Sequence, residues 1–495
     1  MVGSVVSAPA KPQELAQAVV QNDLATVRQL LDGGAEINRP IFGATSLHLA
    51  AEYGRADIAQ LLLDKGAHVD PIDDLGRTPL LWAAENAHLQ VARVLIAHGA
   101  NVNQEDPSRF RGPLDNSPPD TPLDYALRAG NVELCRMLIG SGAKIRANDY
   151  TRLQAAIHSG KPDLVAMLIA KGVDPMARSK PDPNFNTYSG FATAGMSDNV
   201  EMIKLLVSKS RKGAALRPLL NDALQHAAEY GRTPVVRFLL DNTDVDLNRE
   251  VESNYGGVER LADTKTKVPG FTALSRAIEQ GHDDIADALL EKGARIAGRT
   301  RSGAPLLSFV ISQNRDDLFD MLLKHNPPLE AVDYDGRTAL TTAAVQGRLD
   351  IVKALRSRGA SLDKRDSYQS TTLMLACEAG KSDVVEYLVN AGANLHVRDK
   401  DGRDALIYAA MGGHDGICSL LISRGVSPNA LQPTTGMTAL HWAAKKARAG
   451  AVKELLTHGA SPEIADKDGK KPVDYARLAG DAESVALLSA DKPTR

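Results

Sequence analysis

The sequence is poor in the features that mark several classes of protein. Its three cysteines, Cys135, Cys377 and Cys418, lack the paired spacing of a disulfide framework or a zinc ribbon. Lysine and arginine number 58 against 61 aspartates and glutamates, so the charge of −3 does not indicate a basic nucleic-acid-binding surface. Aromatic residues make up only 4% of the chain. The core must therefore be built from Ala, Leu, Val and Ile, which favours thin, closely packed helices over a large globular enzyme core.

The chain also lacks signals for insertion into a membrane. No apolar run reaches the length of about 18 residues that a transmembrane helix needs, so we expect no membrane insertion. Residues 1–10 have neither the basic start nor the long apolar stretch of a full signal peptide. Ser7-Ala8-Pro9-Ala10 resembles the end of a cleavage site. Two locations thus stay open: cytoplasmic, or periplasmic or secreted if a signal peptide once preceded residue 1.

One short phrase, an aliphatic pair followed by two variable residues and Gly-Ala, recurs along the chain. It reads LLDKGA at 62–67 and LIAHGA at 95–100. Its copies end at Gly34, Gly66, Gly99, Gly142, Gly172, Gly293, Gly359, Gly392, Gly425 and Gly459. Neighbouring copies mostly stand 32 to 34 residues apart. Asn326, which also tolerates the left-handed end of a helix, fills one missing place, and Ser210 and Asn242 hold degenerate ones.

A second phrase precedes these copies and predicts the start of a helix. It reads TSLHLAA at 45–51, TPLLWAA at 78–84 and TALHWAA at 438–444. Threonine caps helix N-termini, proline fits the first helical turn, and the paired alanines allow neighbouring helices to approach closely. A glycine-containing loop and a second, Val- and Leu-rich helix follow, and Asp-Gly pairs such as Asp335-Gly336 lie in the turn before the next unit.

Together the two phrases resemble the ankyrin repeat, a unit of about 33 residues with a Thr-Pro-Leu-His-x-Ala core, a β-turn and two antiparallel helices. The resemblance covers about residues 12 to 490. It implies an all-α solenoid of about 13 to 14 helix-turn-helix units with short β-turn or hairpin tips. It also implies protein binding without catalysis, and hydrogen bonding between neighbouring turns for His48 and His441.

The repeat spacing predicts the organisation of the chain. We expect a flexible segment at 1–11, repeats 1 to 7 at 12–248 with an insertion at about 104–119, an inter-repeat insertion at 249–267, repeats 8 to 14 at 268–490, and a tail at 491–495. Polar residues in the first and last units are typical of caps, so we expect a complete array without a separate catalytic domain. The sixth unit has Ala194-Gly195 in place of two alanines, and we expect a weak joint or a bend there.

No catalytic or metal-binding motif is present in the sequence. It holds no His-Glu-x-x-His helix, Walker loop, Gly-x-Ser-x-Gly elbow or Cys-x-x-Cys pair, so we expect no enzyme activity, no cofactor and no metal. Three Asp-x-Asp-Gly turns imitate part of a calcium loop but lack its first and last ligands, so they are interpreted as turns. We expect the cysteines to be buried, and we expect packing between repeats from five rings that share one helix position: Trp82, Tyr125, Tyr408, Trp442 and Tyr475.

Recognition then depends on the surface. The family resemblance points to the turn tips and to the two variable residues after each alanine pair, which would form rows along the concave face. The candidate partner-binding residues are Glu52, Tyr53, Glu85, Asn86, Glu229, Tyr230, Glu279 and Gln280, with Phe110 and Tyr255 in the two insertions. The row is acidic over the first eight units and basic at Lys445-Lys446. An ordinary solvated helix face explains the same residues equally well.

The sequence therefore predicts a monomeric scaffold or adaptor that binds another protein presenting basic groups, and no nucleic acid. An inhibitor or immunity-type protein that caps an enzyme or toxin is one alternative. A cryptic enzyme is the other.

Overall fold

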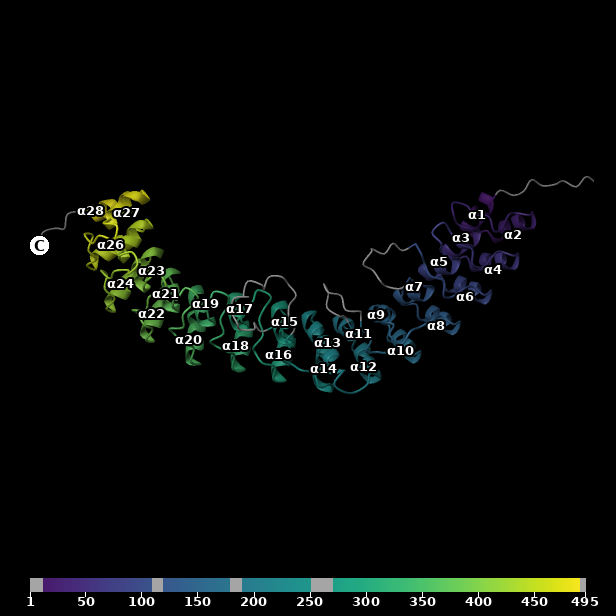
Figure 1. The fold of residues 1–495 in the computed structure, drawn as a ribbon, viewed down its shortest axis with the longest axis horizontal. Coiled ribbons are helices and arrows are strands. Elements are labelled where there is room, and N and C mark those ends of the chain that lie inside the picture. Colours follow the sequence, from purple (N-terminus) through teal and green to yellow (C-terminus); the bar gives the residue numbers. More distant parts are fainter. Residues whose placement is uncertain (1–11, 109–118, 179–188, 251–269, 490–495) are drawn as a thin grey trace, which may run out of the picture. The chain divides into compact units, whose positions relative to one another are not determined.

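The computed structural model describes residues 12–108, 119–178, 189–250 and 270–489. These residues form 28 α-helices joined in pairs, and their β-structure consists of isolated bridges in turns. The prediction of an all-α array of helix pairs is confirmed. The proposed terminal segments 1–11 and 491–495, and most of the two insertions, lie outside the described residues. The chain divides into two compact units, residues 1–246 and 247–495, which are described separately (Figure 1).

The first unit contains seven helix pairs. They are α1 (Pro12–Val20) and α2 (Leu24–Asp32), α3 (Ser46–Glu52) and α4 (Ala56–Asp64), α5 (Pro79–Glu85) and α6 (Leu89–Ala97), α7 (Pro122–Arg128) and α8 (Val132–Gly140), α9 (Tyr150–His158) and α10 (Pro162–Ala170), α11 (Gly190–Met196) and α12 (Val200–Lys209), and α13 (Arg217–Glu229) and α14 (Thr233–Asn242).

The second unit contains seven more pairs. They are α15 (Ala273–Gln280) and α16 (Asp283–Glu291), α17 (Leu306–Ser312) and α18 (Asp316–Lys324), α19 (Ala339–Gln346) and α20 (Leu349–Ser357), α21 (Thr372–Glu378) and α22 (Ser382–Asn390), α23 (Ala405–Gly412) and α24 (Asp415–Ser423), α25 (Ala439–Lys445) and α26 (Ala449–Thr457), and α27 (Pro472–Ala479) and α28 (Ala482–Ser489).

Left-handed residues end most of the helices, as the recurring glycines predict. Gly359 has φ of +94°, and Asn326 has φ of +50° in the place where a glycine is missing. The degenerate places behave differently. Ser210 is extended at the end of α12, and α14 runs through Asn242 to an extended Thr243. Each of these two helices has 10 residues, one more than the usual second helix, because no left-handed residue stops it earlier.

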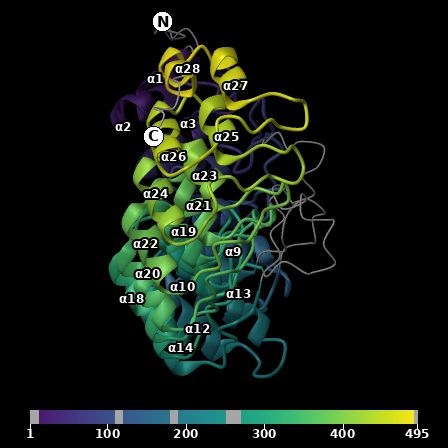
Figure 2. The same ribbon diagram turned by 90° about the vertical axis from the view of Figure 1, so that its left-hand side faces the viewer.

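The helices of each unit stack in two rows. The inner row holds the first, odd-numbered helix of each pair, and the outer row holds the second; both are visible for the second unit in Figure 2. Within each unit, inner helices lie closer to their neighbours than outer helices do at every step. Closer spacing on one side makes a stack of helices curve toward that side, so the inner helices line the concave face of each unit.

The size of the residues in the alanine-pair position sets how closely inner helices approach. The tightest contact among the described inner helices joins α11 and α13, where Gly195 lies against the backbone of Ala223. A Cβ atom on Gly195 would lie 2.5 Å from the Ala223 carbonyl oxygen. The longer helix α13 extends the contact. This close packing contradicts the predicted weak joint between the sixth and seventh repeats, because the glycine that interrupts the motif permits closer approach. The bend, the other expectation for this repeat, stays a prediction.

The loosest contact between inner helices within either unit lies elsewhere. It joins α15 and α17 in the second unit. Ile278 occupies the second alanine place in α15, and Val310 and Ile311 occupy both places in α17. Larger side chains hold the two helix backbones apart. The Arg315 guanidinium spans the step and donates to the Ile278 carbonyl oxygen at 2.6 Å, as Arg232 donates to the Met196 carbonyl oxygen at the tightest step.

We expect Gly195→Ala to destabilise the first unit by about 1–3 kcal/mol, because its Cβ would clash with backbone rather than with a movable side chain. Denaturant unfolding, with hydrogen exchange resolved over 189–250, measures the effect. Gly140→Ala is the matched control, since that helical glycine has nothing within 4 Å of the added Cβ. The control should be neutral or gain up to about 1 kcal/mol. Equal stability changes in the two variants would contradict the close-approach argument.

Candidate interaction surface

A buried or half-buried aspartate organises the turn before many inner helices. The turn aspartates are Asp73, Asp333, Asp366, Asp399 and Asp466. In each, Oδ1 accepts backbone N–H groups from the residues two and four positions later, at 2.8–3.0 Å. The three calcium-like sequences belong to this set, so their first carboxylate oxygen is used by the turn itself. These bonds fix the tips that project beyond the inner helices.

The second carboxylate oxygen usually receives a hydrogen bond from a ring on the inner helix. Trp82 Nε1 donates to Asp73 Oδ2 at 2.9 Å, and the Tyr408 hydroxyl donates to Asp399 Oδ2 at 2.8 Å. Tyr125 and Tyr475 make the same bond to Asp106 and Asp466, and Trp442 bonds Gln432. Burial and the neighbouring carboxylate raise the pKa of Tyr408 to about 12, so its hydroxyl stays a donor. The shared ring position thus ties tip to helix.

The ring is missing in two consecutive repeats, at Thr342 and Leu375. Asp366 Oδ2 is buried there without a hydrogen-bond partner, and the nearest cationic group is Arg337, whose Nε lies 4.0 Å away. A buried carboxylate oxygen without a donor costs stability. The aromatic position thus affects the stability of the tips that have the ring, which packing arguments from the sequence did not foresee.

His48 and His441 join neighbouring repeats, as the family resemblance implies. The backbone N–H of Thr45 donates to His48 Nδ1 at 3.2 Å, and His48 Nε2 bonds the Arg77 carbonyl oxygen in the next turn at 3.0 Å. His441 repeats this arrangement with Thr438 and Lys470. Burial lowers the pKa of both histidines below the usual value, because a buried imidazolium loses its hydration. Neutral histidine with Nδ1 as acceptor is the form that fits.

Two glutamates of the predicted acidic row lie beside arginine side chains. Glu85 forms an ion pair with Arg77 at 3.1 Å, and Glu279 lies 3.9 Å from Arg301. Glu229 lies 3.9 Å from His226, which carries a positive charge only when it is protonated. The Arg301 backbone N–H also donates to Glu279 at 3.0 Å. Glu52 is half-buried and has no ion pair within the described residues. The residual negative charge of the row is therefore smaller than the sequence suggests, and Glu52 contributes most.

Two predicted anchor tyrosines lie on the surface at the ends of inner helices. Tyr53 is 43% exposed at the end of α3, and Tyr230 is 48% exposed at the end of α13. Asn86 and Gln280 are exposed at the same position of their repeats. The candidates therefore occupy one equivalent position in separate repeats. Phe110 and Tyr255 lie outside the described residues.

Exposed apolar residues on the tips form a further set that the sequence reasoning missed. They are Phe42, Ile72, Leu75, Tyr334, Tyr368 and Leu431. The signal was present, because several of these residues lie within or directly beside the turn that precedes an inner helix. The repeat motif consists only of residues that recur in each repeat, and an apolar residue at a variable turn position does not recur.

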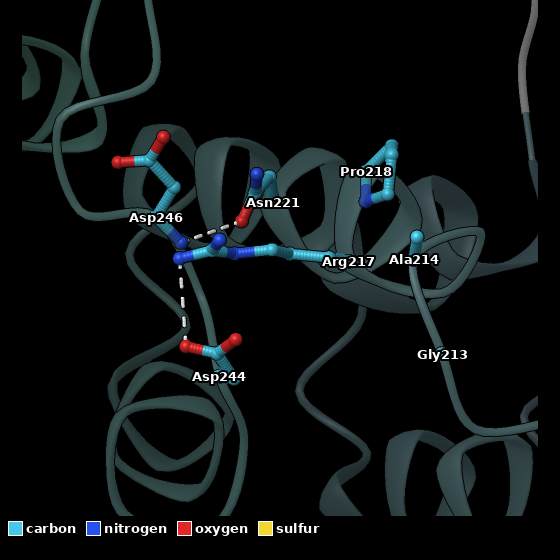
Figure 3. Close-up of a pocket in the computed structure, with 7 residues that line it drawn as sticks. All are labelled: Gly213, Ala214, Arg217, Pro218, Asn221, Asp244 and Asp246. Carbon is cyan, nitrogen blue, oxygen red and sulfur yellow. Dashed lines mark hydrogen bonds and ion pairs between the residues drawn. The ribbon is translucent and has the colours of Figure 1, made fainter.

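One hollow opens on the first unit, but its chemistry does not form a ligand site. It measures about 340 Å³ and lies between the start of α13 and the turn after α14 (Figure 3). Arg217 pairs with Asp244 at 3.4 Å, and Asn221 Oδ1 accepts the Asp246 backbone N–H at 2.8 Å. Its charged groups thus have protein partners. The cysteines are buried, and burial raises the pKa of their thiols, so they are not nucleophiles.

Neither a metal site nor a membrane span is found in the part of the chain that the structure describes. No three His, Cys, Asp or Glu side chains gather there as a metal would require. None of the described helices has the length and apolar character to cross a bilayer. In the described part of the chain, the candidate functional site is therefore the surface formed by the turn tips and the inner helices.

The missing ring predicts a stabilising substitution. In Leu375→Tyr, the new hydroxyl should donate to Asp366 Oδ2 as Tyr408 does to Asp399, raising the unfolding free energy of the second unit by about 1 kcal/mol. Leu375→Phe is the matched control, because it has the ring without the donor. Urea unfolding of both variants measures the difference. Equal stabilities would show that the hydroxyl does not reach the carboxylate.

The two histidines predict acid sensitivity. Their pKa values are lower in the folded than in the unfolded chain, so their contribution is complete above about pH 6.5 and is lost as the pH falls toward the folded-state pKa. Each contributes at most about 1.4 kcal/mol per pH unit. Urea unfolding of His48→Gln and His441→Gln at pH 7.5 and 5.5 should show less pH-dependent loss than the unmodified chain. An unchanged loss would contradict this role.

Comparison with known proteins agrees with the repeat architecture. A family model described as ankyrin repeats (3 copies) matches residues 15–106, 112–179, 191–300, 297–366, 359–432 and 424–494. A second, described as ankyrin repeats (many copies), matches residues 80–139.

Curated relatives match over short stretches. The neurogenic locus Notch protein of Drosophila melanogaster is 52% identical over 56 residues, which cover 11% of this chain and 2% of Notch. Serine/threonine-protein kinase 12 of Arabidopsis thaliana is 43% identical over 60 residues, 12% of this chain and 13% of the kinase. The human ARF GTPase-activating protein GIT1 is 39% identical over 64 residues, 13% of this chain and 8% of that protein. The chain thus spans a small fraction of each relative.

Ankyrin repeats are general protein–protein interaction modules, and the family is typically non-catalytic. The family models match most of the chain, and the helix pairs, capped turns and inter-repeat histidine bonds agree with them. The chain belongs to the ankyrin repeat family.

Proposed function

We propose that the chain is a non-catalytic scaffold or adaptor in the cytoplasm that holds a partner protein on its inner-helix face and turn tips. The observation that supports this most is the fixed row of exposed residues at the ends of the inner helices, which includes Tyr53 and Tyr230. Large amphipathic side chains on a rigid support are favoured binding anchors, because little conformational entropy is lost when they are covered.

The partner of this proposal presents basic groups to the first unit. Glu52 is the glutamate of the row without an ion pair in the described residues, whereas Glu85 and Glu279 lie beside arginines and Glu229 lies beside His226. A rigid surface with residual negative charge accelerates encounter with a positively charged protein. Glu279 and Gln280 offer a further contact in the second unit.

The test distinguishes the contribution of the glutamate charges from that of the tyrosine anchors. A partner is first captured from the native lysate and identified by mass spectrometry, and its binding kinetics are then measured. Replacing Glu52, Glu85, Glu229 and Glu279 by Gln should slow association and flatten its salt dependence, with most of the effect already present in Glu52→Gln. Tyr53→Ala with Tyr230→Ala should speed dissociation, at a cost of roughly 2 kcal/mol or more.

The matched control is Tyr387→Ala on the outer helix α22, which should leave the kinetics unchanged. A different result would redirect the proposal to the insertions. If both sets of variants bind like the unmodified chain, while deletion within 104–119 or 249–267 abolishes binding, the inner-helix face does not carry recognition.

A further inference from the structure

The first two turn tips of the chain expose apolar side chains at equivalent positions. Phe42 is 99% exposed and Leu75 is 56% exposed. They stand 33 residues apart, one repeat, and each directly precedes a turn glycine, Gly43 or Gly76. Ile72, beside the second tip, is 66% exposed. Phe42, Ile72 and Leu75 are called the tip patch below.

Phe42 is an unfavourable residue for the turn that it occupies. Its φ is +49° and that of Gly43 is +82°, in a two-residue turn closed by Ile41 and Ala44 through N–H···O bonds of 2.8 and 3.2 Å. Such turns favour Asn or Asp before the glycine, because these residues tolerate the left-handed conformation. Phenylalanine there combines backbone strain with exposed apolar surface, and within the described residues no burial offsets either. A local rule broken without structural gain indicates selection for function.

The two tips are held together, so the tip patch is a preformed surface. The Asp74 backbone N–H donates to the Gly43 carbonyl oxygen at 3.2 Å. A Cβ on Gly43 would clash with the Asp74 carboxylate, which shows how closely the second tip approaches the first. The second tip is also tied to its inner helix by the Trp82–Asp73 bond. When a partner segment binds the tips, this chain therefore loses little conformational entropy.

The charge around the tip patch is negative. Asp74 is exposed on the second tip, Glu52 is half-buried on the adjoining inner helix, and neither has an ion pair within the described residues. The nearby Arg77 is already paired with Asp73 at 3.2 Å and with Glu85 at 3.1 Å. A segment that covers the tip patch thus meets apolar surface beside uncompensated carboxylates.

We propose that the tip patch anchors a segment of the partner protein that carries an apolar side chain flanked by lysine or arginine. This inference rests on the proposed function and specifies where recognition is concentrated. The apolar side chain covers Phe42 and Leu75, and the basic group meets Asp74 or Glu52. In the free protein no burial offsets the strained backbone of Phe42. When the partner covers the ring, the burial of apolar surface supplies that stabilisation.

The test uses the full chain and a display library of random 16-residue peptides. Peptides enriched on the unmodified chain should pair apolar residues with Lys or Arg. They should bind the double variant Phe42→Asn, Leu75→Asn at least roughly thirtyfold more weakly, the loss expected for hot-spot anchors. Asn suits the left-handed position, so this variant should unfold at the same or a higher urea concentration. Asp74→Asn with Glu52→Gln should reduce affinity and its salt dependence.

The matched control is Leu478→Asn, since Leu478 is 73% exposed in the second unit, outside the tip patch. It should leave peptide affinity unchanged. Peptides that bind the double tip variant as tightly as the unmodified chain would overturn this inference and leave the proposed function standing. A library that yields no binder counts against both. Binding to phosphatidylcholine–phosphatidylserine vesicles that the double variant loses would show that the tips contact lipid, and would also overturn it.

Discussion

The close approach of the inner helices is the constraint on which the rest of the structure depends. Small residues in the alanine-pair position allow backbones to approach, and each helix pair buries its apolar face only against its neighbours. The variation is graded: Gly195 permits the tightest step, and Ile278 facing Val310 and Ile311 gives the loosest. Inner helices approach more closely than outer ones. The geometry of the inner face is therefore set by the small residues buried between the inner helices.

The turn aspartates convert this stack into a surface with fixed tips. One carboxylate oxygen closes the turn through two backbone N–H groups, as at Asp399. In Asp73, Asp399 and Asp466 the other oxygen accepts a hydrogen bond from a ring on the inner helix. Charged side chains are also neutralised locally, since Arg77 forms ion pairs with both Asp73 and Glu85. The surface available for recognition is therefore limited to a few exposed apolar residues and to the carboxylates that have no ion pair within the described residues.

Much of the fold was predictable from the sequence, because its determinants are local and repeated. Threonine caps, alanine pairs and left-handed glycines recur with a period of about 33, so helix pairs and turns follow by counting. Even the histidine bond between turns could be assigned from its phrase. The turn reading of the Asp-x-Asp-Gly segments likewise needed only the missing ligands at both ends of the calcium pattern.

Tertiary structure alone decided the strength of each contact and the availability of each side chain. The sequence marked Gly195 as a defect, but only its distance from the Ala223 backbone shows that the glycine tightens the array. It counted four glutamates as free charge, whereas two lie beside arginines supplied by another part of their repeat or by the next repeat, and Glu229 lies beside His226. It did not identify Phe42, whose exposure and left-handed backbone depend on the turn geometry. Periodicity determines which residues are equivalent, but non-repeating neighbours in space determine what each residue can do.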